Sequence, residues 1–135
     1  HFYTSNPVER DLLVNQYAAL FVYEGPVFYA YSSESSGLFP VYRLVDVARK
    51  MHLFTANPSE RDAVLGAFPS AYLEGTAWWS QAQSGNGSTP VYRYFNRAVN
   101  TFFYTTSEAE RAYINANMSQ QYLEQGVGFY VWLNP

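Results

Sequence analysis

The sequence contains no cysteine, only one lysine and no long apolar run. The absence of cysteine excludes disulfides, zinc–thiolate sites and a cysteine nucleophile, although it does not fix the cellular compartment. The net charge is −3, so the chain lacks the basic surface that binds nucleic acid. No apolar stretch approaches the roughly 18 residues that a transmembrane helix needs, and we therefore expect no membrane insertion.

Aromatic residues are what the chain has in excess. They make up 19% of the 135 residues, with 13 tyrosines, 10 phenylalanines and 3 tryptophans. Hydrophobic residues reach 48% and charged residues only 14%, which favours a folded protein over disorder. The length suits one domain, over residues 1–135, with a core of its own. Such an aromatic excess is typical of proteins in which rings also form a binding surface.

Three segments of the chain resemble one another, at a period of about 50 residues. The segment HFYTSNPVERD at residues 1–11 returns as HLFTANPSERD at 52–62 and as FFYTTSEAER at 102–111. A block ending in Glu-Gly or Glu-Gln-Gly follows each copy, and Pro-Val-Tyr-Arg occurs twice, at 40–43 and 90–93. These matches divide the chain into three repeats, at residues 1–39, 40–89 and 90–135.

Each repeat is predicted to contain two strands, a helix and a further strand. The Pro-Val-Tyr-Arg and His-Leu-Phe-Thr segments are aromatic and β-branched, which is typical of strands, and we expect a turn near Asp46 or Asn96 between them. Each helix begins with an N-cap side chain and a glutamate three residues later, a pattern in which the carboxylate bonds the N-cap N–H. These pairs are Asn6 and Glu9, Asn57 and Glu60, and Ser107 and Glu110.

A unit of this size cannot bury its apolar face alone, so neighbouring units must cover one another. We therefore expect a mainly β fold with short helices, in which three β-β-α-β repeats form a pseudo-threefold, propeller-like ring. A trefoil-like ring fits the helices less well. The first repeat lacks a Pro-Val-Tyr-Arg strand ahead of residue 1. Either the mature chain begins inside a repeat, or residues 130–133 fill the gap and close the ring.

The ordered blocks resemble a repeat family of unknown function. Its units read roughly P-L-Y-R-L-Y-N, then H-F-Y-T-T-x-x-x-E-R, then Y-E-G-x-x-G-Y. Such repeats occur in secreted fungal and bacterial proteins, often beside cell-wall or polysaccharide-degrading modules. The resemblance covers essentially the whole chain and implies an extracellular, lectin-like binding module without established catalytic residues. One departure is Phe102, which replaces the expected histidine in the third repeat.

Patterns for catalysis or metal binding are not found in the sequence. The two histidines, His1 and His52, occupy the same repeat position, and no metal-ligand motif includes them. The repeated glutamates are explained by caps and turns, whereas a catalytic carboxylate pair would occur once. We therefore predict a protein that is not an enzyme and needs no metal or cofactor. A polysaccharide-active enzyme with copper at His1 is a remote alternative.

Carbohydrate binding is the function that the composition favours, because sugars stack on aromatic rings while fixed polar groups bond their hydroxyls. Trp78 and Trp79 are adjacent on a predicted strand, so one of them is expected to face outward. The candidate binding residues are Trp78, Trp79, Trp132, Tyr42, Arg43, Tyr92, Arg93 and His52. The competing interpretation places the tyrosines in the core and pairs the arginines with the turn glutamates.

The sequence therefore predicts a secreted, multivalent lectin with shallow, aromatic-lined sites for cell-wall or glycoprotein glycans. Two sequons, at Asn86 and Asn117, mildly favour secretion. The alternative is a protein-interaction or scaffold module of a secreted enzyme, which would carry a contiguous apolar patch in place of sugar-sized clefts. The identity of the sugar and the oligomeric state are left open.

Overall fold

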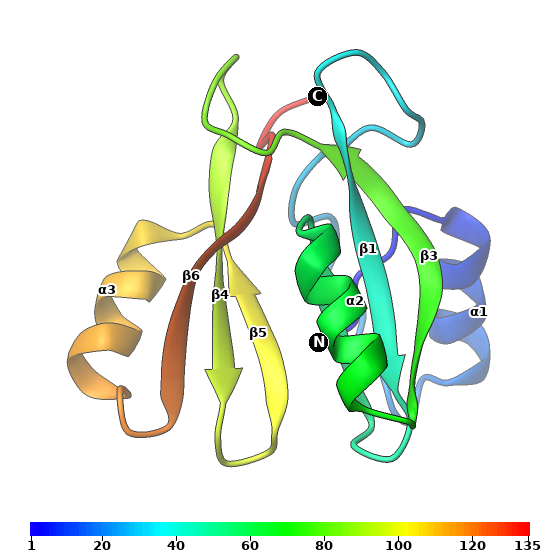
Figure 1. Cartoon of the computed structure of the whole chain (residues 1–135), viewed down its shortest axis with the longest axis vertical. Coiled ribbons are helices and arrows are strands. Elements are labelled where there is room, and N and C mark those ends of the chain that lie inside the picture. Colours follow the sequence, from blue (N-terminus) through cyan, green and yellow to red (C-terminus); the bar gives the residue numbers. More distant parts are fainter.

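A computed structural model describes all of residues 1–135 and shows a mainly β chain with three short helices (Figure 1). Two three-stranded antiparallel sheets form its body, with strand orders β2-β1-β3 and β5-β4-β6. The strands are β1 (Phe39–Asp46), β2 (Met51–Thr55), β3 (Ala71–Ser80), β4 (Thr89–Asn96), β5 (Thr101–Thr105) and β6 (Tyr122–Val131). Each Pro-Val-Tyr-Arg segment lies in a central strand, paired on both edges.

The helices are α1 (Pro7–Gln16), α2 (Pro58–Ala67) and α3 (Glu108–Asn117). In Figure 1 the two sheets stand side by side, with α3 flanking the second sheet and α1 lying beyond β3. Each helix has 10 residues, and none is long and apolar enough to cross a bilayer.

All three helices begin at the predicted N-caps. The side chains of Asn6, Asn57 and Ser107 accept hydrogen bonds from N–H groups of the first turn. The predicted return bond from each glutamate to the N-cap N–H is not formed. Instead, a threonine hydroxyl two residues earlier accepts that N–H at 3.0 Å in every case, and these threonines are Thr4, Thr55 and Thr105. The helix-start glutamates are therefore available for other partners.

The centre of the core is a triangle of rings from Tyr3, Phe54 and Tyr104. Their centroids lie 5.7, 5.8 and 5.8 Å apart, and each pair is edge-to-face, with angles of 88°, 83° and 89°. Aromatic pairs prefer this geometry because the positive ring edge meets the negative face. The buried Tyr104 hydroxyl donates to the Phe54 carbonyl at 3.1 Å and accepts from its N–H at 2.8 Å. Burial raises the pKa of Tyr104 well above its usual value.

A second triangle lies against the first and consists of Phe28, Trp78 and Phe129. The three pairs have centroid separations of 5.4, 6.2 and 5.5 Å and angles of 65°, 66° and 67°. Each triangle takes one ring from the first third of the chain and one from each sheet. The rings therefore bind together three segments that are far apart in sequence.

In both sheets the pairing between the central strand and the last strand shifts register at the same place. In the first sheet, Val41 pairs with Trp78 and the next residue pairs with Thr76, so Ala77 is skipped. In the second sheet, Val91 pairs with Phe129 and Gly128 is skipped in the same way. A bulge of this kind shifts the alternation of side chains between the two faces of a strand.

The first third of the chain differs from the prediction, because it contains α1 but no strand. Residues 1–5 and 21–28 join no sheet, and only Tyr29 and Tyr31 form isolated bridges, to Trp132 and Trp79. Residues 130 and 131 are the end of β6, so the C-terminal segment does not take the place of the missing Pro-Val-Tyr-Arg strand.

The turn between β1 and β2 gives a first testable prediction. Asp46 accepts the N–H groups of Ala48 and Arg49, both at 3.1 Å, which confirms the predicted turn. Lys50 completes this turn at φ 54°, and Asn100 takes φ 53° in the corresponding turn between β4 and β5. Asparagine tolerates this left-handed region better than lysine.

Lys50→Asn should therefore raise the free energy of unfolding by about 0.5 kcal/mol, and Asn100→Lys should lower it by a similar amount. Urea unfolding measures both, and equal signs for the two variants would contradict the explanation.

Candidate functional site

The two adjacent tryptophans of β3 lie on opposite faces of the strand, as expected, and the inward one is Trp78. It is 3% exposed and is enclosed by the rings of Phe28, Phe54 and Phe129. Its ring cannot stack on a ligand, so the prediction that Trp78 forms a binding surface is wrong. Trp79 points the other way and is partly exposed.

The predicted tyrosines, Tyr42 and Tyr92, are packed beneath arginines. The Arg61 guanidinium lies over the ring of Tyr42 at 4.4 Å, and that of Arg111 lies over the ring of Tyr92 at 4.1 Å. Tyr92 is buried and its hydroxyl donates to Glu108, which raises the pKa of Tyr92. One face of each ring is therefore already covered.

Arg43 joins the first helix to the first sheet. Its guanidinium donates two parallel hydrogen bonds to Glu9, at 2.9 and 2.8 Å, and a third to Glu74 at 2.9 Å. The side chain is 15% exposed. Hydrogen bonds from Arg43 lower the pKa of Glu9 below its usual value. A fork of this kind is among the stronger charge-assisted interactions in proteins.

Arg93 makes the corresponding contact between the second helix and the second sheet. It donates to the two oxygens of Glu60 at 2.8 and 2.6 Å, and its side chain is 11% exposed. Burial acts to raise the pKa of Glu60, but hydrogen bonds from Arg93 and Thr55 outweigh it and lower the pKa. Both guanidinium groups thus bind carboxylates and are largely buried, which leaves little for a sugar hydroxyl, although the buried Nε of Arg93 has no hydrogen-bond partner.

His52 is held within the first sheet. Its Nε2 lies 3.2 Å from Glu74, and its ring meets the ring of Phe2 edge-on at 4.9 Å. Burial lowers the pKa of His52, which disfavours the charged form of the imidazole that would pair with Glu74. His1 lies 3.8 Å from Glu24 in a similar arrangement. No three metal-binding side chains come together anywhere in the chain.

The two remaining candidates, Trp79 and Trp132, lie at the ends of β3 and β6, and the segment of residues 29–31 connects them. The backbone of Trp79 exchanges hydrogen bonds of 2.8 and 3.0 Å with Tyr31, and that of Trp132 exchanges bonds of 2.7 and 3.0 Å with Tyr29. A further bond joins the Tyr130 N–H to the carbonyl of Gln81 at 3.2 Å. The ends of β3 and β6 and the segment of residues 29–31 are therefore joined pairwise by three isolated bridges, which we call the cycle of bridges.

The outward side chains at these linked ends form a surface that we call the aromatic end face, consisting of Tyr29, Tyr31, Trp79, Tyr130 and Trp132. Tyr29 is 43% exposed and Tyr31 52%, and the other three are partly exposed. The ring of Tyr31 meets that of Trp132 edge-on at 5.2 Å. The Trp132 indole also donates to the Asn86 carbonyl at 3.1 Å, which fixes its orientation.

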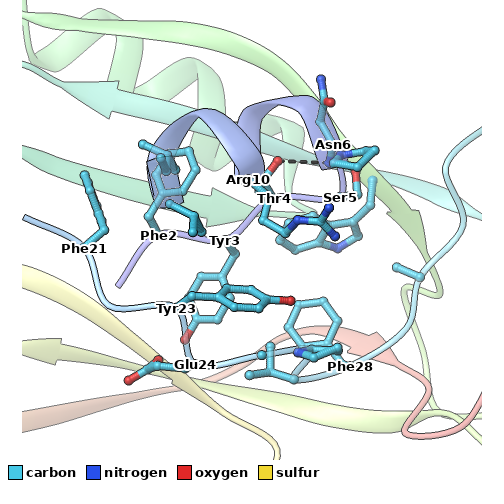
Figure 2. Close-up of a pocket in the computed structure, with 18 of the residues that line it drawn as sticks. Phe2, Tyr3, Thr4, Ser5, Asn6, Arg10, Phe21, Tyr23, Glu24 and Phe28 are labelled. Carbon is cyan, nitrogen blue, oxygen red and sulfur yellow. Dashed lines mark hydrogen bonds between the residues drawn. The ribbon is translucent and has the colours of Figure 1, made fainter. Parts of the chain in front are cut away.

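A hollow of about 360 Å³ lies between residues 2–14 and 21–30 (Figure 2). Hydrophobic residues make up most of its wall, and Figure 2 shows Phe2, Tyr3, Tyr23 and Phe28 around it. A second hollow, of about 320 Å³, is lined by His1, Tyr3, Glu24, Phe103, Glu110 and neighbouring residues.

The two hollows adjoin, because Tyr3, Glu24, Val27 and Phe28 line both of them. We call them together the N-terminal cleft. None of the candidate residues taken from the sequence lines this cleft except Trp78, at its floor. No sequence pattern considered above pointed to this cleft, because its lining residues at 1–14 and 21–30 come together only in the folded chain.

With this geometry in place, the chain can be assigned to a family. It belongs to the family described as Domain of unknown function (DUF5648), which matches residues 1–132. No curated protein and no solved structure matches this chain.

The contact between Glu60 and Arg93 gives a second prediction. Glu60→Gln leaves a largely buried guanidinium without its counter-charge, so the free energy of unfolding should fall by about 2 kcal/mol. The matched control is Glu110→Gln at the same position of the third helix, where no arginine is bound. That change should stay within about 0.5 kcal/mol of the wild type. Equal losses in the two variants, measured by urea unfolding, would show that the ion pair is not the cause.

The pH dependence of stability gives a third prediction. The pKa of Glu60 is lower in the folded chain than its usual value, so the stabilisation is present above that value and is lost as the pH falls through the folded pKa. The urea midpoint of the wild type should therefore decrease between about pH 5 and pH 3. Glu60→Gln should show a shallower decrease over the same interval, because its side chain does not titrate. Parallel pH profiles would contradict this assignment.

Proposed function

We propose that this domain is a secreted, lectin-like protein that binds glycans of cell walls or glycoproteins at the aromatic end face. The observation that carries the proposal is the gathering of Trp79, Trp132 and three tyrosines on one partly exposed surface. Ring faces of this kind stack on the C–H surface of a sugar, and no cofactor is needed.

The proposal includes the ring of three repeats. It is supported by the two ring triangles, by the cycle of bridges and by the shared register of the two sheets. In this arrangement Tyr29, Trp79 and Tyr130 occupy equivalent positions, and so do Tyr31, Gln81 and Trp132. The three part-sites meet at one end of the molecule. A branched or multivalent glycan would bind such a surface more tightly than a single sugar, because its second contact is intramolecular.

Secretion is part of this proposal. Asn86 and Asn117, which begin the two sequons, are both exposed. Asn86 lies in a turn at φ 48°, next to the aromatic end face through its bond to Trp132. Surface turns of this kind are suitable acceptors of N-linked glycans.

We favour binding over catalysis for a positive reason. Both histidines and most of the arginines that could act on a substrate already contact carboxylates, as expected of side chains that hold a fold together. The alternative of a protein-interaction module is favoured by a different feature, the N-terminal cleft, whose larger hollow is lined mostly by hydrophobic residues.

A fourth prediction tests the glycan proposal. On an array of cell-wall and glycoprotein glycans, the wild type should bind a defined subset. The double variant Trp79→Ala, Trp132→Ala should bind that subset at least about tenfold more weakly, because each lost stacking contact costs about 1 kcal/mol. The matched control is Tyr113→Ala, which removes a 62%-exposed ring on α3, outside this surface.

Calorimetry with the best glycan gives the affinities, and circular dichroism establishes that the double variant is folded. An array without binding, or equal affinities for the wild type and the double variant, would refute the proposal.

A further inference from the structure

The aromatic end face carries almost no charge. Three segments form it and its rim, residues 29–39, 79–90 and 129–135, and none of them contains a lysine, an arginine or a histidine. Glu34 is the one charged side chain in these segments, and it is exposed. Because the aromatic rings themselves are neutral, the charge that a ligand meets at this face comes from a single carboxylate.

Three of the eight lysines and arginines lie at the opposite end of the molecule. In Figure 1 the C-terminus and the loops that precede β1 and β4 lie at one end, and the turns that follow these two strands lie at the other. The turns hold Arg49, Lys50 and Arg97. The 8 residues of β1 span roughly 26 Å, several times the screening length of about 8 Å at physiological salt, so these cations do not act on the end face.

The remaining arginines each contact a carboxylate, and they are Arg10, Arg43, Arg61, Arg93 and Arg111. Arg10 lines the N-terminal cleft together with Tyr29, and its guanidinium lies 2.7 Å from the carboxylate of its neighbour Asp11. The charges of these arginines are thus compensated locally. None of them offers an unpaired guanidinium to an anionic ligand at the end face.

The rim of the face is rich in hydroxyl and amide groups. Residues 32–38 include four serines, and residues 82–88 include two serines, a glutamine and an asparagine. Both loops close with the same turn, in which the N–H of Leu38 donates to the carbonyl three residues earlier at 3.1 Å and that of Ser88 does so at 2.9 Å. The loops therefore hold uncharged polar groups next to the rings, where they can bond sugar hydroxyls.

Glu34 lies close to the rings because of its place in the chain. It follows Tyr31 by three residues, so the two Cα atoms are at most about 11 Å apart. Tyr31 is bridged to Trp79, and its ring meets that of Trp132 edge-on. A glycan of several sugar units that stacks on these rings can therefore bring a charged group next to the Glu34 carboxylate.

We propose that the aromatic end face selects cationic glycans, namely oligosaccharides of glucosamine whose amines are not acetylated. This inference rests on the function proposed above and adds to it the chemical class of the ligand. The ammonium groups are attracted by the negative faces of the tryptophan and tyrosine rings and by the Glu34 carboxylate. Glycans that carry carboxylates or sulfates are rejected, because no cation on the face compensates their charge. Neutral glycans of the same shape bind through the rings alone.

The experiment compares tetrasaccharides of glucosamine, glucose and glucuronic acid that share one linkage and differ at a single group of each sugar. Calorimetry at about pH 5.5, where amines are protonated, should show the glucosamine oligomer bound at least about fivefold more tightly than the glucose oligomer. The glucuronic acid oligomer should not bind. The preference for the glucosamine oligomer should shrink in about 0.5 M NaCl, because salt screens exposed charges.

Two variants with the same change in net charge locate the effect. Glu34→Gln should reduce the preference for the glucosamine oligomer to about twofold, because only the attraction to the rings remains. The matched control is Glu110→Gln on α3, outside this face, which should keep the wild-type preference. The double variant Trp79→Ala, Trp132→Ala should bind the glucosamine and glucose oligomers at least about tenfold more weakly.

Three results would overturn this inference. The first is binding of the glucose or glucuronic acid oligomer that equals or exceeds that of the glucosamine oligomer. The second is a preference for the glucosamine oligomer that Glu34→Gln leaves undiminished, or that Glu110→Gln reduces to the same extent. The third is no binding of the glucosamine oligomer at about millimolar concentration.

The glycan array separates this inference from the function on which it rests. If the wild type binds other glycans of the array and loses them in the tryptophan double variant, the proposed function stands and only the preference for cationic glycans is wrong. If the wild type binds neither the array nor the three oligomers, both proposals are wrong.

Discussion

Mutual edge-to-face packing of aromatic rings at the centre of the molecule holds the rest of the structure in place. Every ring of the two triangles contacts both other members, so no ring can shift without opening two contacts. Each triangle draws one ring from each third of the chain, so the same contacts fix how the two sheets and the N-terminal segments stand to one another. These ring contacts explain why Phe54, Trp78, Tyr104 and Phe129 are buried rather than exposed.

Ion pairs between arginines of the sheets and glutamates of the helices connect these elements outside the aromatic core. Arg43 and Arg93 extend from central strands to the helix that precedes each strand's sheet. Because the N-cap N–H groups are satisfied by threonines, the glutamates at the third helical position are free to accept these arginines. The first and second helices are thus each attached to the sheet that follows by a forked ion pair, whereas the corresponding glutamate of the third helix, Glu110, lines the N-terminal cleft.

Local features of the fold could be predicted from the sequence, since they depend on nearby residues. The N-caps at Asn6, Asn57 and Ser107 and the turn at Asp46 were confirmed for this reason. The side of β3 that holds the core could not be predicted. A bulge at Ala77 shifts the alternation, so Trp78 turns inward and Trp79 outward.

The competing interpretation that pairs arginines with turn glutamates holds for Arg43 and Glu74. The arginine partners of the helix-start glutamates Glu9 and Glu60 could not be predicted, because the caps already explained these glutamates. At the aromatic end face, the tryptophans were recognised but Tyr29 and Tyr31 were not. Their place beside the tryptophans depends on bridges between the ends of segments that share no local pattern.

The cycle of bridges has a consequence for how the chain acquires its structure. Tyr29 pairs with Trp132, and the hydroxyl of Tyr3 donates to the carbonyl of Tyr104, 101 positions further along. The N-terminal third therefore reaches its final partners only after residues 130–132 have left the ribosome. Contacts of such high sequence separation slow folding and prolong the exposure of apolar surface. During that interval the aromatic segments at residues 1–5 and 21–31 lack part of their final contacts.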